Sequence, residues 1–367
     1  MRLAALCSFA VSLSSVEGAK AEPSSLIITV NSTKALYKAV DRANRRGGNT
    51  VVIIEPGIYQ LTTTLNITGN NIELESGSKN PVDTILRGKG MKATSSVDNL
   101  LRVTGQHFRF SGLTGEAAPN HIIQIVGEAN ADYAIIENCI LQDAYEQLLK
   151  VSHRYNGETA ADSGIVRHCT FGYTAGIGPQ YYIGGIDLHL GENWLIEANQ
   201  FFGIASPEKR IAEHAIHLWY DSKSNQVTNN IIINSDRGIG FGMGNKGNVA
   251  GLIQNNIIYH ADNAHPFADA GIILESSPLT QIDSNWVIQY HDYPNAIEYR
   301  FAGTQEVRIS NNRINQRIRK RNGANADIVA NKQVQDLTAV QKNAILKRFP
   351  PLYQQQVFDT LYPQELN

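Results

Sequence analysis

The chain has 367 residues, of which 42% are hydrophobic, so it can bury a large core in either one elongated repeat domain or two globular domains. Its formal net charge is −2 at pH 7. Such a balanced charge argues against a nucleic acid or a membrane surface as a partner held by bulk electrostatic attraction.

The first 21 residues have the pattern of a secretory signal peptide. Met1-Arg2 is a charged start, residues 3–16 are mostly apolar, and Ala19-Lys20-Ala21 carries the small residues of a cleavage site. A buried N-terminal helix is the alternative interpretation, which the Glu22-Pro23 dipeptide disfavours. We therefore expect cleavage after Ala21 and export to the periplasm or the medium. No later segment is apolar for long enough to span a bilayer, so we expect no membrane insertion.

Residues 22–49 are expected to form an N-terminal cap. Ser32 or Thr33 can cap a helix, Gly47-Gly48 can end it, and the apolar residues between them have helical spacing at Leu36, Ala39, Val40 and Ala43. A β-branched run at residues 51–54 follows and is closed by the turn at Pro56-Gly57. A helix that leads into a strand in this way can cover the open end of a solenoid, which would otherwise expose unpaired backbone and apolar side chains.

The middle of the chain is a repeat. Seven copies of a seven-residue segment align without gaps, and their fifth positions are Cys139, Cys169, Asn199, Asn230, Asn256, Asn285 and Asn312. The differences between these residue numbers are 30, 30, 31, 26, 29 and 27. Repeats of this length, with several short strands each, predict one coil of a solenoid per repeat. Coils stacked about 4.8 Å apart pair each strand in parallel with its copy in the next coil. The recurring asparagines are expected to form a hydrogen-bonded ladder that serves the fold.

On these features the chain resembles the right-handed parallel β-helix proteins of the pectate-lyase-like superfamily. The ladder, the repeat length and the opening TVVIIEPGIY at residues 50–59 carry the resemblance, which covers roughly residues 50–335. Residues 291–301 also look similar to a stretch of exported bacterial β-helix proteins of unassigned activity. The resemblance implies an all-β fold, a right-handed parallel β-helix solenoid at residues 50–335 with an N-terminal capping helix. It implies no single activity, because the superfamily includes lyases, hydrolases, epimerases and non-enzymatic adhesins.

Residues 336–367 are expected to form a C-terminal helical cap. Leu337, Val340, Ala344 and Ile345 have helical spacing up to Pro350-Pro351, and a second short helix follows. A basic cluster at residues 313–321 precedes this cap, and we interpret it as a solvated last coil rather than an anion-binding patch.

Cys139 and Cys169 replace the ladder asparagine in two adjacent coils. Their Cα atoms should lie about 5 Å apart, a separation that a disulfide accepts. Two buried thiols that pack on each other are the alternative. In either case we expect the two cysteines to be structural.

One sheet of the solenoid carries an unusual set of outward side chains. With Ile186 and Leu188 inside, alternation places Asp187 and His189 outside, facing solvent. The same rule gives a first column of Lys150, Asp187, His217, Gly240, Ile273 and Glu298, and a second of His189, Trp219, Gly242, Glu275 and Arg300. Neighbours in a column should lie about 5 Å apart. Histidines, a tryptophan and carboxylates in register favour a functional site, and ion pairs that merely stabilise the sheet face are the alternative.

Loops next to this face are expected to form binding walls. Residues 173–182 and 202–214 are long, aromatic and glycine-bearing. For substrate binding we select Tyr181, Tyr182 and Trp219 to stack on sugar rings, Arg237 to hold a carboxylate, and Gly240 to let a long chain approach the backbone.

An exported solenoid with an open groove fits a linear polysaccharide, and two mechanisms can be built on it. In β-elimination from a uronic acid, Arg300 or Arg237 neutralises the carboxylate and a neighbouring group protonates the leaving oxygen. The candidate bases that take the C5 proton are Lys150, His189 and His217. In hydrolysis the acid and the base or nucleophile are Glu275 and Glu298, with Asp187 as a third candidate.

Comparison with superfamily motifs removes some candidates. The chain has neither the Gly-His-Gly motif of polygalacturonases nor the calcium-binding aspartates of pectate lyases. The alginate and chondroitin lyases of this fold place a lysine on one coil and an arginine-histidine pair on a following one. Lys150 matches that lysine, but His189 stands where the arginine would be. We expect no cofactor, with calcium held by Asp187, Glu275 or Glu298 as the open alternative.

The resulting hypothesis is an exported, monomeric enzyme that acts on a linear polysaccharide, with a lyase placed ahead of a glycoside hydrolase or an epimerase. The competing class is a β-helix protein that binds glycans or another surface without cleaving them. Catalysis requires at least two titratable groups that converge on one substrate atom, whereas binding requires aromatic and neutral polar groups.

Overall fold

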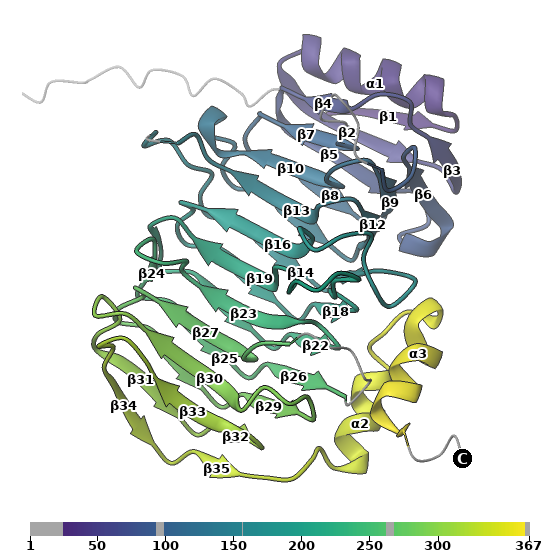
Figure 1. Ribbon diagram of the computed structural model, residues 1–367. Coiled ribbons are helices and arrows are strands. Elements are labelled where there is room, and N and C mark those ends of the chain that lie inside the picture. Colours follow the sequence, from purple (N-terminus) through teal and green to yellow (C-terminus); the bar gives the residue numbers. More distant parts are fainter. Residues whose placement is uncertain (1–24, 93–98, 156, 262–267, 364–367) are drawn as a thin grey trace, which may run out of the picture.

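The computed structural model describes residues 25–92, 99–155, 157–261 and 268–363, so the predicted signal peptide lies outside the described residues and stays a prediction. Three long parallel sheets run along the molecule, and successive coils add one strand after another to each (Figure 1). The predicted right-handed parallel β-helix is confirmed. Among the described residues, no helix is long and apolar enough to cross a membrane.

The twelve-stranded sheet contains, in spatial order, β1 (Leu26–Val30), β2 (Gly48–Ile54), β5 (Asn70–Ser76), β8 (Arg109–Ser111), β11 (Ile135–Glu137), β14 (Ile165–Arg167), β17 (Leu195–Glu197), β21 (Gln226–Thr228), β25 (Leu252–Gln254), β28 (Gln281–Asp283), β31 (Val307–Ser310) and β34 (Ala326–Val329). The eleven-stranded sheet contains β3 (Gly57–Gln60), β6 (Thr84–Arg87), β9 (Thr114–Ala118), β12 (Ile140–Ala144), β15 (Thr170–Gly172), β18 (Gln200–Phe202), β22 (Ile231–Ile233), β26 (Ile257–His260), β29 (Trp286–Gln289), β32 (Arg313–Ile314) and β35 (Lys332–Gln333).

The ten-stranded sheet carries the predicted columns. It contains β4 (Leu65–Ile67), β7 (Leu101–Val103), β10 (Ile123–Val126), β13 (Gln147–Ser152), β16 (Gly184–His189), β19 (His214–Trp219), β23 (Arg237–Phe241), β27 (Ile272–Glu275), β30 (Asn295–Arg300) and β33 (Arg317–Lys320). Two short strands, β20 (Ser222–Lys223) and β24 (Asn248–Val249), pair beside it.

The core is a set of aliphatic rows that run along the solenoid axis. In the twelve-stranded sheet one row is fully buried and contains Ile136, Val166, Ile196, Val227, Ile253, Ile282 and Ile309. β-branched side chains fit a pleated, buried surface, and similar side chains at paired positions of adjacent coils pack on one another. The row therefore fixes which face of each short strand points inward.

The asparagine ladder is confirmed. The side-chain amide of Asn230 donates to Asn256 Oδ1 at 3.0 Å, Asn256 donates to Asn285 at 3.0 Å, and Asn285 donates to Asn312 at 2.9 Å. Each of these residues is fully buried. The left-handed backbone lies one position earlier, as at Asn255 with φ 57°. The ladder residue therefore stabilises the turn through hydrogen bonds of its side chain, while its neighbour adopts the turn conformation.

The two cysteines of the ladder are free, buried thiols, so the alternative of packed thiols holds in the structure. The backbone N–H of Cys139 points to Cys169 Sγ at 3.4 Å, and the N–H of Cys169 donates to Asn199 Oδ1 at 2.9 Å. The thiols thus continue the ladder with weaker acceptors.

Helix α1 (Thr33–Arg45) is the predicted N-terminal capping helix, with Ser32 accepting a hydrogen bond from the Ala35 N–H. It packs against β1, β2 and β4 at one end of the solenoid (Figure 1). Its buried residues are the predicted Leu36, Ala39, Val40 and Ala43.

Helices α2 (Ala339–Leu346) and α3 (Pro351–Leu361) form the predicted helical C-terminal segment. They lie along the outer face of the eleven-stranded sheet, where Phe349 and Tyr353 join a buried apolar cluster with Phe202 and Tyr259 (Figure 1). Tyr353 Oη also donates to Gln142 Oε1 at 3.0 Å. The segment thus covers one side of the solenoid, from β12 to β29, rather than only its C-terminal end.

The ladder yields the first testable prediction. Asn256→Leu should lower the free energy of unfolding by about 3 kcal/mol, because the Asn230 N–H and the Val227 carbonyl lose their buried partner. Thermal unfolding followed by circular dichroism measures the change. Gln226→Leu, at an exposed position of the same sheet, is the control that should unfold like the wild type. Equal destabilisation of both variants would contradict a structural role of the ladder.

Candidate active site

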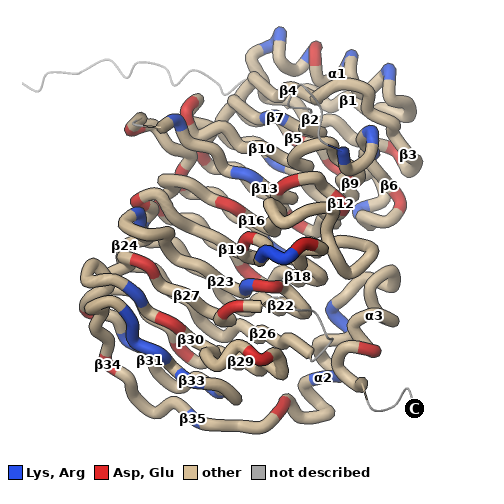
Figure 2. The backbone as a smooth tube through the Cα atoms, in the orientation of Figure 1, with Lys and Arg blue, Asp and Glu red and all other residues tan. Residues whose placement is uncertain are grey.

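The register of the ten-stranded sheet is as predicted. Lys150 pairs with Asp187, Asp187 with His217, His217 with Gly240 and, farther along, Ile273 with Glu298. In the second column His189 pairs with Trp219, and Glu275 pairs with Arg300. Figure 2 shows basic and acidic positions along the strands of this sheet, from β13 to β33. We call this surface the charged face.

The expectation that these side chains face solvent is wrong for most of the first column. They point away from the solenoid core, but Asp187 is only 5% exposed, His217 3% and Glu298 0%. The physical reason is that the side chains pack against one another as hydrogen-bonded ion pairs, as a desolvated charge requires. Adjacent loops add to the cover, and Tyr293 of one such loop contacts Glu298 directly.

Lys150, Asp187 and His189 converge on one point. The Lys150 ammonium forms a short ion pair with Asp187 Oδ2, and its Nζ lies 2.8 Å from His189 Nε2. His189 Nε2 lies 3.1 Å from the same carboxylate oxygen. Three titratable groups thus lie within hydrogen-bond reach of one another on this face.

Asp187 is the anion on which this group depends. Burial alone would raise its pKa, but the charge of Lys150 and the neighbouring His189 outweigh burial and hold the pKa of Asp187 well below its ordinary value. The Trp219 indole N–H also donates to Asp187 Oδ1 at 2.9 Å. Asp187 is therefore a permanent carboxylate that orients its neighbours rather than a proton donor.

Trp219 is more enclosed than a sugar-stacking platform. Its ring stacks on His217 at a centroid separation of 5.5 Å, and its edges meet His189 at 4.5 Å and Tyr220 at 5.3 Å. The indole therefore positions Asp187 and the two histidines. Tyr220 is not among the residues predicted from the sequence. It follows the end of β19 and has a left-handed backbone, with φ 63°, so the alternation of the strand does not extend to it.

His217 lies deeper than predicted. Its Nε2 is 3.2 Å from the Gly242 carbonyl, and its Nδ1 is 3.6 Å from Asp187 Oδ1. Burial lowers the pKa of His217, so the ring is neutral near pH 7. At 3% exposure the ring of His217 is closed to a substrate, whereas the side chains of Lys150 and His189 are 11% and 16% exposed.

Gly240 does not offer open backbone to a polymer. The ring of His214 fills that space, because a Cβ on Gly240 would come within 2.5 Å of His214 Nε2. Strict alternation from Ile216 would place His214 inside the solenoid, so His214 is not among the site residues predicted from the sequence. Ala215 and Ile216 both belong to the core, so alternation is interrupted there and His214 returns to the outer face.

The loop before β19 brings Glu213 and His214 to the charged face. Asp236 Oδ2 accepts hydrogen bonds from the backbone N–H groups of Ser206, at 3.0 Å, and Ala212, at 2.8 Å, and so holds both ends of this loop. Arg237 follows Asp236 and lies 3.8 Å from Glu213 and 3.5 Å from Asp269. Its side chain is 26% exposed, and its Nε is buried without a hydrogen-bond partner in the described part of the chain.

Glu275, Glu298 and Arg300 form a second group. Arg300 Nε lies 2.5 Å from Glu298 Oε2 and Arg300 Nη1 lies 3.0 Å from Glu275 Oε1. Glu298 also accepts hydrogen bonds from Tyr293 and Asn295, each at 2.5 Å, and from Arg321 at 3.1 Å. Burial would raise the pKa of Glu298, but these donors and the charge of Arg300 lower it below its ordinary value. Glu275, Glu298 and Arg300 therefore form an ion-pair network. A carboxyl whose pKa is lowered in this way is a poor proton donor for hydrolysis.

The two groups do not share a substrate atom. β13 and β30 are five strands apart in the sheet, which at strand spacing places Lys150 and Arg300 about 24 Å apart along the axis. For the same reason Asp187 cannot share one calcium ion with Glu275 or Glu298. Calcium requires six to eight oxygen ligands, and these carboxylates already hold lysine and arginine side chains, so the set does not fit that ion.

The two predicted tyrosines differ. Tyr181 packs under Arg210, with the guanidinium carbon 3.7 Å from the ring centre. Tyr182 is 40% exposed, and burial, together with the charge of Asp187, raises the pKa of its phenol to about 12. The hydroxyl of Tyr182 therefore stays protonated near pH 7 and is near enough to Asp187 to be affected by its charge.

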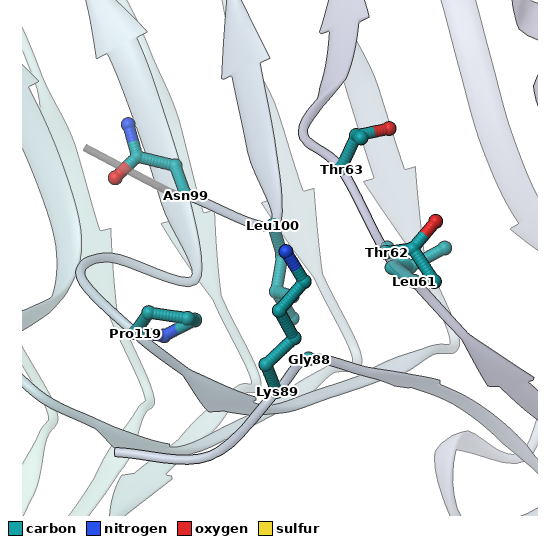
Figure 3. Close-up of a pocket in the computed structure, with 8 residues that line it drawn as sticks. All are labelled: Leu61, Thr62, Thr63, Gly88, Lys89, Asn99, Leu100 and Pro119. Atoms are coloured by element: carbon teal, nitrogen blue, oxygen red, sulfur yellow. The ribbon is translucent and has the colours of Figure 1, made fainter. Parts of the chain in front are cut away.

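Hollows also lie away from this group, and one of them, of about 850 Å³, is lined by Tyr290, Asn315, Gln333, Val334, Gln335 and Asp336. A space of about 10 Å³, large enough for about one water molecule, lies near the N-terminal end (Figure 3). Its lining is Leu61, Thr62, Thr63, Gly88, Lys89, Asn99, Leu100 and Pro119, which offers no converging acid and base. A hollow of about 360 Å³ at the C-terminal end of the charged face is basic, and its lining is Pro294, Asn295, Arg317, Arg319 and Arg321.

No protein-family model and no curated protein matches the chain. Among solved structures, it is similar to an alginate lyase from Paenibacillus sp. str. FPU-7, with a TM-score of 0.59 and 14% identity over 84% of this chain and 98% of the other. A mannuronic acid specific polysaccharide family 6 lyase from human gut microbiota matches with a TM-score of 0.52 and 13% identity over 92% and 99% of the two chains. The catalytic domain of a GH87 α-1,3-glucanase in complex with tetrasaccharides matches with a TM-score of 0.58 and 14% identity, over 87% of this chain but 60% of the other. Identities this low establish the shared parallel β-helix fold alone.

The buried Glu298 carboxylate predicts a pH dependence of stability. A carboxyl whose pKa is lowered on folding contributes stability above its unfolded pKa, about 4.3, and that contribution is lost as the pH falls through the folded value. Glu298→Gln should lower the free energy of unfolding by about 3 kcal/mol near pH 7, because Arg300 and Arg321 lose a buried counter-charge.

Denaturant titrations from neutral pH down to about pH 3 test this prediction across that window. The Glu298→Gln variant should lose less stability on acidification than the wild type. Glu208→Gln, at an exposed loop position, serves as the control with wild-type behaviour. A variant curve parallel to that of the wild type would show that Glu298 does not carry the effect.

Proposed function

We propose that this protein is an exported polysaccharide lyase that cleaves a linear, uronate-containing glycan by β-elimination. The observation that carries the proposal is the convergence of Lys150 Nζ, His189 Nε2 and Asp187 Oδ2 on the charged face, where the side chain of His189 is 16% exposed. The structural neighbours whose names include alginate or mannuronic acid, with identities of 14% and 13%, support the choice of a uronate polymer.

We assign His189 as the base. Its Nε2 lies 2.8 Å from the nitrogen of Lys150, whose ammonium is paired with Asp187 and so has no free lone pair. His189 takes the proton from C5 of the uronate while Asp187 stabilises the positive charge that results. Tyr182, whose phenol stays protonated, donates a proton to the leaving glycosidic oxygen.

Arg237 is the better of the two predicted carboxylate ligands. It is three strands from Lys150 rather than five, and its contacts with Glu213 and Asp269 are as long as 3.8 Å and 3.5 Å. Arg300, by contrast, is held by Glu275 and Glu298 at 3.0 Å and 2.5 Å. Arg237 can therefore turn toward a substrate carboxylate, as electrostatic stabilisation of the developing enolate requires.

The length of the charged face fits a polymer. From β13 to β33 it spans six strand spacings, about 29 Å, and it ends at the basic hollow of Arg317 and Arg319. A chain of uronates that lies along the axis meets the base near one end and these arginines at the other. We propose that the protein acts as a monomer, because one chain carries all of these groups.

The base is tested by substitution. Lys150→Met and His189→Gln should each lower kcat on a polyuronate by about 100-fold or more, because the first removes the cation that holds Asp187 and His189 in place and the second removes the base. The double variant should be little worse than either single one, since the two groups act as a unit. Ultraviolet absorbance of the unsaturated product, on a panel of uronate polymers, measures the rate.

Lys223→Met, a half-exposed lysine paired with Glu192 outside the group, is the matched control that should keep wild-type activity. Formation of new reducing ends without an unsaturated product would replace the lyase by a hydrolase. Neither product, with retained binding of a polyuronate, would show a glycan-binding protein without catalysis.

The basic hollow is tested by affinity. Replacing both Arg317 and Arg319 by serine should raise KM for a long polyuronate by about fivefold and leave kcat unchanged, because exposed charge pairs contribute up to about 1 kcal/mol. The effect should shrink at high salt. Arg313→Ser is the control, since Arg313 lies on the eleven-stranded sheet over Trp286. An unchanged KM would place the substrate elsewhere.

A further inference from the structure

The buried side chain of His214 has no partner that explains it. The residue is 6% exposed, and within the described residues neither Nδ1 nor Nε2 has a hydrogen-bond partner. Native proteins rarely bury a polar ring in this way, because the lost hydration is not replaced. The side chain that fills the space over Gly240 therefore calls for a ligand.

Two further donor groups lie beside His214. One ring nitrogen each of His214 and His217 and one carboxylate oxygen of Glu213 all lie within 4.8 Å of one another. The two imidazole centroids are 4.4 Å apart. Two imidazoles and one carboxylate make a ligand set that Zn²⁺ and related ions accept, with a further position left for water.

The surroundings hold these donors in place. The indole of Trp219 stacks on His217, and His217 Nε2 faces the Gly242 carbonyl at 3.2 Å. A neutral ring that donates its N–H to a carbonyl keeps a lone pair on the other nitrogen, which is the usual outer-shell arrangement of a metal-binding histidine. The absence of a side chain at Gly240 supplies the space for the His214 ring.

We propose that Glu213, His214 and His217 bind one divalent transition-metal ion of the Zn²⁺ class. Ligand atoms on a tetrahedral zinc ion lie about 3.4 Å apart. The three ligand atoms lie within 4.8 Å of one another, so small side-chain movements would bring them to that separation. Glu213 is 25% exposed, which gives the ion a path from solvent.

The protonation state of the histidines supports this assignment. Burial lowers the pKa of both His214 and His217, and for His217 it outweighs the charges of Asp187 and Glu213, which raise that pKa. Both rings are therefore neutral and able to bind a metal near pH 7. Asp187, whose Oδ1 lies 3.6 Å from His217 Nδ1, adds a negative charge that favours a cation at this position. Arg237 is the nearby opposing charge, and its contact with Glu213 would be exchanged for the ion.

The site stands apart from the proposed lyase activity, because it rests on other residues than Lys150 and His189. Its position one strand from Asp187 would place a positive charge closer to His189 than Arg300 lies. Binding is therefore measured without substrate, so that failure of one proposal leaves the other intact.

The test uses the purified protein after treatment with a chelator. Titration with Zn²⁺ in a calorimeter should show one ion per chain, and Co²⁺ in its place should give the visible absorption bands of nitrogen coordination. Zn²⁺ should also raise the unfolding temperature, since it binds only the folded state. Glu213→Gln and His214→Gln should each weaken binding by roughly tenfold or more.

His121→Gln is the matched control, because His121 is a buried histidine just before β10 whose Nδ1 already faces the Gln147 carbonyl at 3.0 Å. It should bind Zn²⁺ like the wild type. If His214→Gln does not fold, Glu213→Gln decides the question, since its side chain is partly exposed. No saturable binding by the wild type, or equal affinity in the wild type and both ligand variants, would overturn the proposal.

Discussion

Hydrogen bonds between buried asparagine side chains of successive coils are the constraint on which the rest of this molecule depends. Asn230, Asn256 and Asn285 each donate to the next residue of the ladder at 3.0, 3.0 and 2.9 Å. The same oxygens accept the backbone N–H of the preceding coil, so a shift of one residue would leave several buried groups unpaired. The ladder thereby fixes the register of the neighbouring sheets, although the loops between coils vary in length.

That register is why the sequence predicts the columns so well and their environment so poorly. The pairing of Lys150 with Asp187 and of Asp187 with His217 follows from aligning the coils and counting along each strand. Burial does not follow from this counting, because it depends on which side chains fold onto the sheet from loops with no repeat. Glu298 shows the difference, since Tyr293 and Arg321 enclose it from outside its own strand.

His214 shows a second limit of pattern analysis. Strict alternation holds only while the strand is regular, and β19 begins at a point where Ala215 and Ile216 both enter the core. No feature of residues 213–217 announces that interruption, whereas the apolar pattern of the strand is plain. The helical C-terminal segment was predicted for the opposite reason, since its spacing is local, but the side that it covers depends on the distant partners Phe202 and Tyr259.

The charged face combines groups that an isolated sheet could not keep. A buried carboxylate is stable only where cations or donors replace its water, and Asp187 and Glu298 each meet that condition with a separate set of partners. The two sets differ in what remains accessible. Around Glu298 the donors are saturated and the carboxylate is enclosed, which suits rigidity. Around Asp187 the Lys150 and His189 nitrogens lie next to each other, so a proton taken up there is stabilised by the negative charge of Asp187. We therefore expect chemistry at the Asp187 end of the charged face. The fold shared with lyases and a glucanase does not decide which reaction occurs there. The ladder and the aliphatic rows constrain the inward side chains and leave the outward columns free to vary.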